Sequence, residues 1–320
     1  MNRSVALAAM LLATAAPVEA SHLVDDSYTV AQRFADYRDR YSGIRLPVVA
    51  PRTGQTMSYD IAYKRIGERE LHIDVFGPAP GMRRRQGLVL VHGGAWRSGG
   101  KAHFYALANL LAQRGLTIFL PEYRLSPEAR YPAGIDDIRD ALAWAQQHAS
   151  DYGITADRIA LGGASSGGQM ASLLAYRDTA APTPGRPRPN ALIDIDGVLD
   201  PTTSLALEYE DAAGPASPLA QWLGGSFEQS PDLWREASAT RYVGPAAPPT
   251  LIVSSGTPRF TAGRDAVLAT LAQYHVRAAT YTFSNAPHDV WLFEPYVSRL
   301  ADEINAFLRA VASDRGSRRP

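Results

Sequence analysis

The regular alternation of short apolar runs with helical segments restricts the fold of this 320-residue chain more than any other feature. Seven runs are rich in β-branched and aromatic residues, as strands are. They cover residues 70–76, 87–91, 116–120, 158–162, 191–197, 250–255 and 277–283. Between them, leucines and isoleucines recur at helical spacing over residues 107–111 and 135–142. This alternation predicts an α/β protein with a mainly parallel central sheet flanked by helices.

The first twenty residues have the pattern of an export signal. Arg3 precedes an apolar run over residues 5–16, and the small residues Val18 and Ala20 flank the expected cleavage site. The pattern predicts a signal peptide over residues 1–20, with the mature chain beginning near Ser21. The chain has no cysteine, which excludes disulfides and thiolate chemistry. We therefore expect a protein secreted by a bacterium or held in its periplasm.

Charge and length limit the partners and the number of domains. Lysine plus arginine and aspartate plus glutamate both number 32, so no net field attracts nucleic acid. No other apolar run is long enough for a membrane span. We expect one domain over residues 21–312 and a flexible tail over 313–320. The stretch from about 206 to 249 is too long for a simple connection, and we expect a small cap insertion there.

A glycine-flanked serine follows the predicted strand over residues 158–162. In "GGASSGG", Ser165 has Gly163 and Gly167 at the minus-two and plus-two positions, giving G-x-S-x-G. A nucleophilic serine on a sharp strand-to-helix turn needs small residues at both places. We therefore assign the nucleophile to Ser165 rather than Ser166, and expect Ser166 to contribute its backbone N–H.

Two further segments supply what such a serine requires. "VHGGAW" places Gly93 and Gly94 at the end of a predicted strand, where their N–H groups could stabilise an oxyanion, and His92 there should brace the turn. His288 follows the last predicted strand, in a loop where a general base must lie. Of the seven histidines, it alone is placed in this way.

These segments resemble the esterase branch of the α/β-hydrolase fold. "HGGAW", "YGITADRIALGGASSGG" and "PHDVWLF" are similar to sequences of secreted bacterial carbohydrate acetylesterases related to acetylxylan and pectin acetylesterases. The resemblance extends from about residue 63 to residue 308. It implies Ser165 as nucleophile, His288 as base, and the N–H groups of Gly93, Gly94 and Ser166 as the oxyanion site.

The acid that would orient His288 departs from the pattern usual in hydrolases of this fold. Hydrolases of this fold usually carry an aspartate three residues after the glycine that follows the seventh strand, and Arg259 stands three residues after Gly256. An arginine cannot accept a proton from His288. The string "PRFTAGRD" resembles a feature of the acetylesterase branch and favours Asp265. The alternatives are Asp200, which could instead be a turn residue, and Asp289.

The expected activity is hydrolysis of short acyl esters, chiefly acetyl esters on plant polysaccharide or oligosaccharide. Trp96, Trp222 and Trp291 are candidate walls for a sugar ring, although tryptophans often serve only in packing. We expect no metal and no cofactor. A general carboxylesterase or lipase is the alternative enzyme. A hydrolase-fold binding protein without catalysis is the alternative from another class, and loss of turnover in Ser165→Ala would argue against it.

Overall fold

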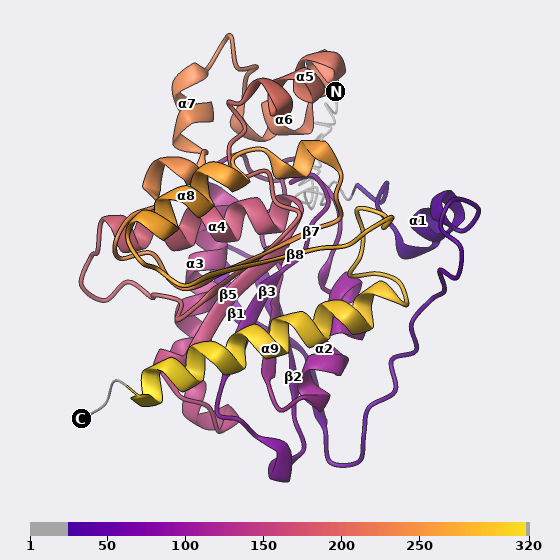
Figure 1. The fold of residues 1–320 in the computed structure, drawn as a ribbon, viewed down its shortest axis with the longest axis vertical. Coiled ribbons are helices and arrows are strands. Elements are labelled where there is room, and N and C mark those ends of the chain that lie inside the picture. The colour runs from indigo at the N-terminus through magenta and orange to yellow at the C-terminus, as the bar shows by residue number, and fades with distance from the viewer. Residues whose placement is uncertain (1–24, 318–320) are drawn as a thin grey trace, which may run out of the picture.

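An eight-stranded sheet runs through the computed structural model, which describes residues 25–317 (Figure 1). The predicted signal peptide lies outside these residues. The strand order is β1-β2-β4-β3-β5-β6-β7-β8, with β1–β2 and β2–β4 antiparallel and the remaining neighbours parallel. The strands are β1 (Thr56–Ile66), β2 (Arg69–Gly77), β3 (Gly87–Val91), β4 (Thr117–Pro121), β5 (Ile159–Ala164), β6 (Leu192–Ile195), β7 (Thr250–Ser254) and β8 (Ala278–Thr282).

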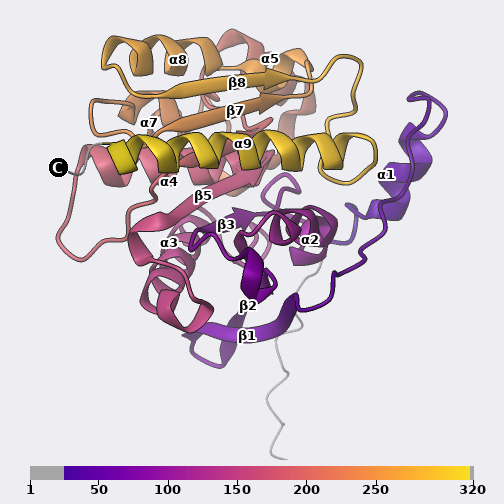
Figure 2. The same ribbon diagram turned by 60° about the horizontal axis from the view of Figure 1, so that its bottom comes forward.

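Helices follow most of the strands, as the sequence predicts (Figure 2). They are α1 (Val30–Tyr37), α2 (Tyr105–Gln113), α3 (Ala133–Gln147), α4 (Ser166–Ala180), α5 (Ser204–Ala213), α6 (Pro218–Leu223), α7 (Pro231–Glu236), α8 (Arg264–Gln273) and α9 (Tyr296–Ser317). Helix α9 continues five residues beyond position 312, so the first part of the predicted flexible tail is helical. Residues 318–320 lie outside the described residues.

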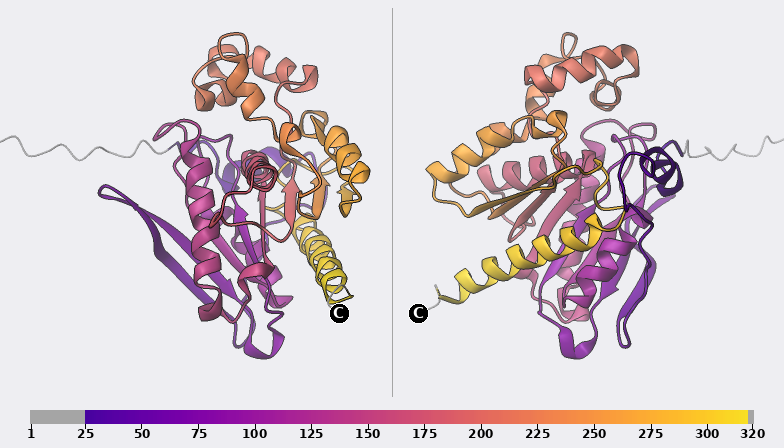
Figure 3. Two further views of the ribbon diagram at one scale, coloured as in Figure 1. Left: turned by 90° about the vertical axis from the view of Figure 1, so that its left-hand side faces the viewer. Right: turned by 45° about the vertical axis from the view of Figure 1, so that its right-hand side comes forward.

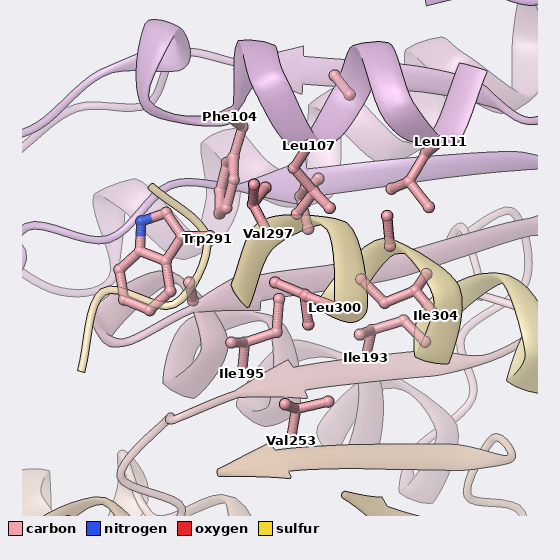
Figure 4. Packing of buried hydrophobic residues seen from close by; sticks show 14 of the residues in the cluster. Phe104, Leu107, Leu111, Ile193, Ile195, Val253, Trp291, Val297, Leu300 and Ile304 are labelled. Atoms are coloured by element: carbon pink, nitrogen blue, oxygen red, sulfur yellow. The ribbon is translucent and has the colours of Figure 1, made fainter. Parts of the chain in front are cut away.

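Alternation along the strands buries apolar side chains on both faces of the sheet. In β3, Leu88 and Leu90 join the cluster packed beneath α2 and α9, whereas Val89 and Val91 join the cluster beneath α3, α4 and α8. Figure 4 shows part of the first cluster, with Leu300 of α9 beside side chains of β6 and β7. Burying a side chain of this size contributes about 1.5–3 kcal/mol. Because both faces are covered, the central parallel strands β3, β4 and β5 are fully buried and consist mainly of apolar residues.

The segment predicted as a cap lies between β6 and β7 and contains α5, α6 and α7. Figure 3 shows these helices grouped at one end of the molecule. Trp222 and Trp234 are each only 1% exposed, and both belong to the cluster beneath α3 and α4. The insertion is therefore packed onto the main body and shares its core.

Among residues 25–317, no helix is both long enough and apolar enough to cross a bilayer.

Candidate active site

Ser165 occupies a strained turn between β5 and α4. Its φ of 54° and ψ of −124° lie in a region that side-chain-bearing residues rarely adopt. Its N–H donates to the carbonyl of Ile195 at 2.8 Å. A Cβ at Gly163 would lie 2.3 Å from the carbonyl oxygen of Gly167, and one at Gly167 would lie 2.2 Å from that of Val91. Glycine is therefore required on both sides of Ser165, as the sequence argument predicts.

The loop after β3 has an unusual backbone conformation. Gly94, Ala95 and Trp96 all have positive φ, at 131°, 54° and 59°. A Cβ on Gly94 would come within 2.1 Å of the Ser98 carbonyl oxygen, so this position also requires glycine. Among the backbone hydrogen bonds of the described loops, none uses the N–H of Gly93, Gly94 or Ser166 as donor. These predicted oxyanion donors are therefore available to a ligand oxygen.

His92 supports this loop from inside the protein. Its Nδ1 lies 2.9 Å from the Gly93 carbonyl oxygen, and Tyr123 stacks on its ring and donates to its carbonyl at 3.0 Å. Burial lowers the pKa of His92 to about 3, so its imidazole is neutral near pH 7 and Nδ1–H can donate to Gly93. The prediction that His92 braces the turn is consistent with these contacts.

His288 is held by the carboxylate of Asp196. Its Nδ1 lies 2.8 Å from Asp196 Oδ2, and the other carboxylate oxygen accepts the Ser255 N–H at 2.8 Å. The His288 ring also stacks on Phe260, with centroids 3.7 Å apart and planes 8° apart. Since Nδ1 is engaged by Asp196, Nε2 is the ring nitrogen left for a reacting group.

Asp196 directly follows β6, on the strand next to β5, and is 1% exposed. Its φ is 52°, a left-handed conformation that aspartate tolerates better than most residues. Ser165 and Asp196 thus stand on tight turns at the carboxyl ends of adjacent parallel strands.

One cavity of about 370 Å³ brings these groups together. It is lined by Ser165, Ser166, Gly94 and His288, together with residues of the N-terminal segment, the cap and the loop after β7. The volume is near the lower end of the range for small-molecule sites. Within residues 25–317, no group of three or more acidic or histidine side chains is placed to hold a metal ion.

The acid is the main correction to the sequence analysis. Asp265, in the first turn of α8, has an 84% exposed side chain and pairs with Arg264 at 3.0 Å, so it does not orient His288. Asp200 instead accepts hydrogen bonds from Thr202 and Thr240, as a turn residue would. The third alternative was also wrong, because the Asp289 carboxylate binds two tyrosine hydroxyls and Arg33.

Asp196 was missed because the sequence analysis placed it inside the strand predicted over residues 191–197. The observed strand ends at Ile195. The Asp-Gly pair at residues 196–197 was the available signal, since this dipeptide favours a turn and leaves the carboxylate at the strand end.

Comparison with known proteins identifies the family. The BD-FAE family model matches residues 73–259, more than half of the 320-residue chain. The matched segment contains the loop after β3, Ser165 and Asp196. The chain belongs to the BD-FAE family. His288 lies beyond the matched segment, and its contact with Asp196 connects it to the rest of this site.

Relatives of this BD-FAE protein are named as ester hydrolases. Esterase LipQ of Mycobacterium tuberculosis is 28% identical over 78% of the chain and 61% of its own length. Probable carboxylic ester hydrolase LipM of the same organism is 37% identical over 40% of the chain. The chain thus covers less than two thirds of either relative, and only 29% of LipM.

Solved structures confirm the predicted α/β-hydrolase fold. Esterase B from Lactobacillus rhamnosis superimposes with a TM-score of 0.69 at 20% identity, covering 90% of this BD-FAE chain and 94% of that one. A bacterial heroin esterase gives a TM-score of 0.67 at 23% identity, covering 81% and 85% of the two chains.

The three tryptophans proposed as sugar platforms have different surroundings in this BD-FAE protein. Trp96 lines the cavity and donates from its indole N–H to Gln169 at 3.1 Å. Trp222 stacks behind Trp96, 1% exposed, and does not line the cavity. Trp291 is 0% exposed and packs near Phe104, as Figure 4 shows. Only Trp96 can therefore contact a ligand in this cavity, and the other two serve in packing.

A second carboxyl group lies two residues before Asp196 on β6. Burial, and then the charge of Asp196, raise the pKa of Asp194 to about 8. An unfolded aspartate titrates near pH 4. Between about pH 4 and pH 8 the folded protein therefore holds a proton that the unfolded chain releases, and stability falls as pH rises through this window.

Asp194→Asn should weaken this pH dependence, because the amide is neutral throughout. We expect the fall in Tm from pH 5 to pH 8 to be smaller in Asp194→Asn than in the unsubstituted protein, as measured by calorimetry. The exposed Asp265→Asn is the matched control and should follow the unsubstituted protein. An equal fall in Tm with pH in all three proteins would contradict the raised pKa of Asp194.

Proposed function

We propose that the chain is a serine carboxylesterase that hydrolyses short acyl esters through Ser165, His288 and Asp196. The observation that carries this proposal is the His288–Asp196 contact of 2.8 Å beside a cavity that also exposes the strained Ser165. The esterase names of the relatives support the reaction class.

In the first half of the proposed reaction, His288 Nε2 accepts the hydroxyl proton of Ser165 as Oγ attacks the acyl carbon. Asp196 fixes the ring tautomer and stabilises the imidazolium that results. The oxyanion accepts hydrogen bonds from the N–H groups of Ser166, Gly94 and Gly93, and each such donor contributes about 10²–10³-fold to the rate. The protonated His288 then donates to the departing alcohol oxygen, leaving an acyl-Ser165 ester.

In the second half, His288 takes a proton from water, and the hydroxide attacks the same acyl carbon. The tetrahedral intermediate collapses with return of the proton to Ser165 Oγ, so the products are a carboxylic acid and the free enzyme. The chemistry uses only groups of this chain and one water molecule.

We further propose acetyl esters of carbohydrates as the substrates. The small cavity volume favours a short acyl group, and its serine, tyrosine and arginine side chains suit a hydroxyl-rich alcohol better than an alkyl chain. The predicted export signal would place such an enzyme with extracellular polysaccharide, and we therefore propose a secreted or periplasmic location.

The acyl length dependence tests this proposal. We expect kcat/KM for 4-nitrophenyl acetate to exceed that for the octanoate by at least about tenfold, because a small site rejects added methylenes. Acetate should also be released from acetylated xylooligosaccharides. Faster turnover of the octanoate would favour a lipase or general carboxylesterase. Absence of turnover in folded protein would favour a binding protein.

A further inference from the structure

Three arginines line the cavity that holds Ser165 and His288: Arg33, Arg97 and Arg259. Two of them have carboxylate partners that do not line it, since Asp25 pairs with Arg97 and Glu210 pairs with Arg259. In these two pairs the positively charged residue lines the cavity and its negatively charged partner does not. This arrangement favours a ligand that carries negative charge.

The third pair, Arg33 with Asp289, also favours a negatively charged ligand. Asp289 does line the cavity, but its two carboxylate oxygens accept the hydroxyls of Tyr28 and Tyr37, each at 2.8 Å, and Arg33 Nε lies 3.1 Å from the second oxygen. This carboxylate is 1% exposed. It is therefore engaged by the protein and adds little repulsion towards an anion.

Arg259 is the best placed of the three. Glu210, 5% exposed, binds one terminal nitrogen of its guanidinium. The guanidinium carbon lies 5.4 Å from the ring centroid of Tyr209 and 5.5 Å from that of Phe260. Phe260 in turn stacks on His288. These contacts place the cation in the cavity wall next to the proposed base.

The guanidinium retains donors that the protein does not use. Among the described residues, Arg259 Nε is buried and has no hydrogen-bond partner, and Glu210 engages only one terminal nitrogen. A guanidinium carries five N–H donors in a planar fork that matches a carboxylate. The Arg259 side chain as a whole is 26% exposed and lines the cavity, so the terminal donors that Glu210 does not engage can meet a ligand carboxylate.

We propose that Arg259 binds a carboxylate on the alcohol part of the ester, so that the site selects acetyl esters of acidic alcohols, such as acidic sugars, over neutral ones. This inference rests on the proposed esterase function and adds a specificity residue to it. Arg33, which also lines the cavity, adds positive charge for the same ligand.

A matched pair of acetyl esters tests the inference. 3-Acetoxybenzoate carries a carboxylate on its alcohol part, and 3-acetoxybenzamide is neutral and of similar size. We expect kcat/KM to be about tenfold or more higher for the benzoate, and this preference to decrease as salt is raised. In Arg259→Gln we expect kcat/KM for the benzoate to fall about 10- to 100-fold more than kcat/KM for the benzamide, because only the benzoate carries the carboxylate.

Two further variants distinguish loss of the carboxylate site from an effect on folding. Arg259→Gln leaves Glu210 as an unpaired buried charge, so the double variant Arg259→Gln/Glu210→Gln removes both charges and should also lose the preference. Arg264→Gln, an arginine outside the cavity, is the matched control and should keep it.

The possible outcomes separate the two proposals. Hydrolysis of both esters at equal rates by the unsubstituted protein, or an unchanged preference in both Arg259 variants, would overturn the carboxylate site alone. If the folded protein hydrolyses none of the three esters, 4-nitrophenyl acetate included, the esterase proposal itself is overturned.

Discussion

Ser165→Ala should lower kcat for 4-nitrophenyl acetate by about 10⁵- to 10⁶-fold. The substitution removes the oxygen that forms the acyl-enzyme, and the remaining groups act only on water. Since Ser165 lies on the cavity wall and its side chain supports no hydrogen bond of the described structure, the fold should persist. The measurement is steady-state hydrolysis, with Tm recorded for each protein.

Ser166→Ala provides the matched control, because it changes the neighbouring serine and keeps the backbone N–H that we assign to the oxyanion site. We expect it to lower kcat by less than about tenfold, well short of the loss of an oxyanion donor. Small and equal losses in the two variants would show that the serine of this turn is not a nucleophile.

Asp196→Asn should lower kcat by about 10⁴-fold while KM changes little. The amide retains the shape of the carboxylate but can present N–H to His288 Nδ1, which would place the ring proton on Nε2 and prevent it from accepting the Ser165 proton. The amide also lacks the charge that stabilises an imidazolium. Steady-state hydrolysis of 4-nitrophenyl acetate measures both parameters.

Asp265→Asn distinguishes this assignment from the one suggested by the sequence. Its exposed side chain contacts only the neighbouring Arg264 among the described residues, so we expect kcat to stay within about twofold of the unsubstituted protein. Loss of turnover in Asp265→Asn, with normal turnover in Asp196→Asn, would show that Asp265 of α8 is the acid that orients His288.

Most of the sheet could be predicted because its buried strands consist mainly of apolar residues. All seven predicted strands are present, with ends within two residues of those observed. The missed strand, β1, lies at the sheet edge and has no fully buried residue, so its sequence contains no apolar run. The positions of Ser165 and His288 were predictable for a related reason, since each follows a recognisable strand.

The acid was harder to predict because several aspartates follow strands, and the predicted end of this strand lay two residues beyond the observed one and so hid Asp196 inside the strand. Asp200 lies in the loop after β6, but Asp196 at the start of that loop makes the contact with His288. The tryptophans were ambiguous for another reason. Trp96 and Trp222 stack on each other, and only their depth in the fold separates a cavity wall from core.

Covalent capture tests the central claim, that Ser165 is an activated nucleophile, most directly. After treatment with diethyl 4-nitrophenyl phosphate, we expect one diethylphosphoryl group per chain, together with proportional loss of ester hydrolysis. Tryptic peptide 159–177 contains Ser165, Ser166 and Ser172, so fragment masses must locate the group. We expect the group to lie on Ser165 and to be absent from Ser165→Ala. A label on another serine, or full hydrolytic activity in protein that takes up no label, would contradict it.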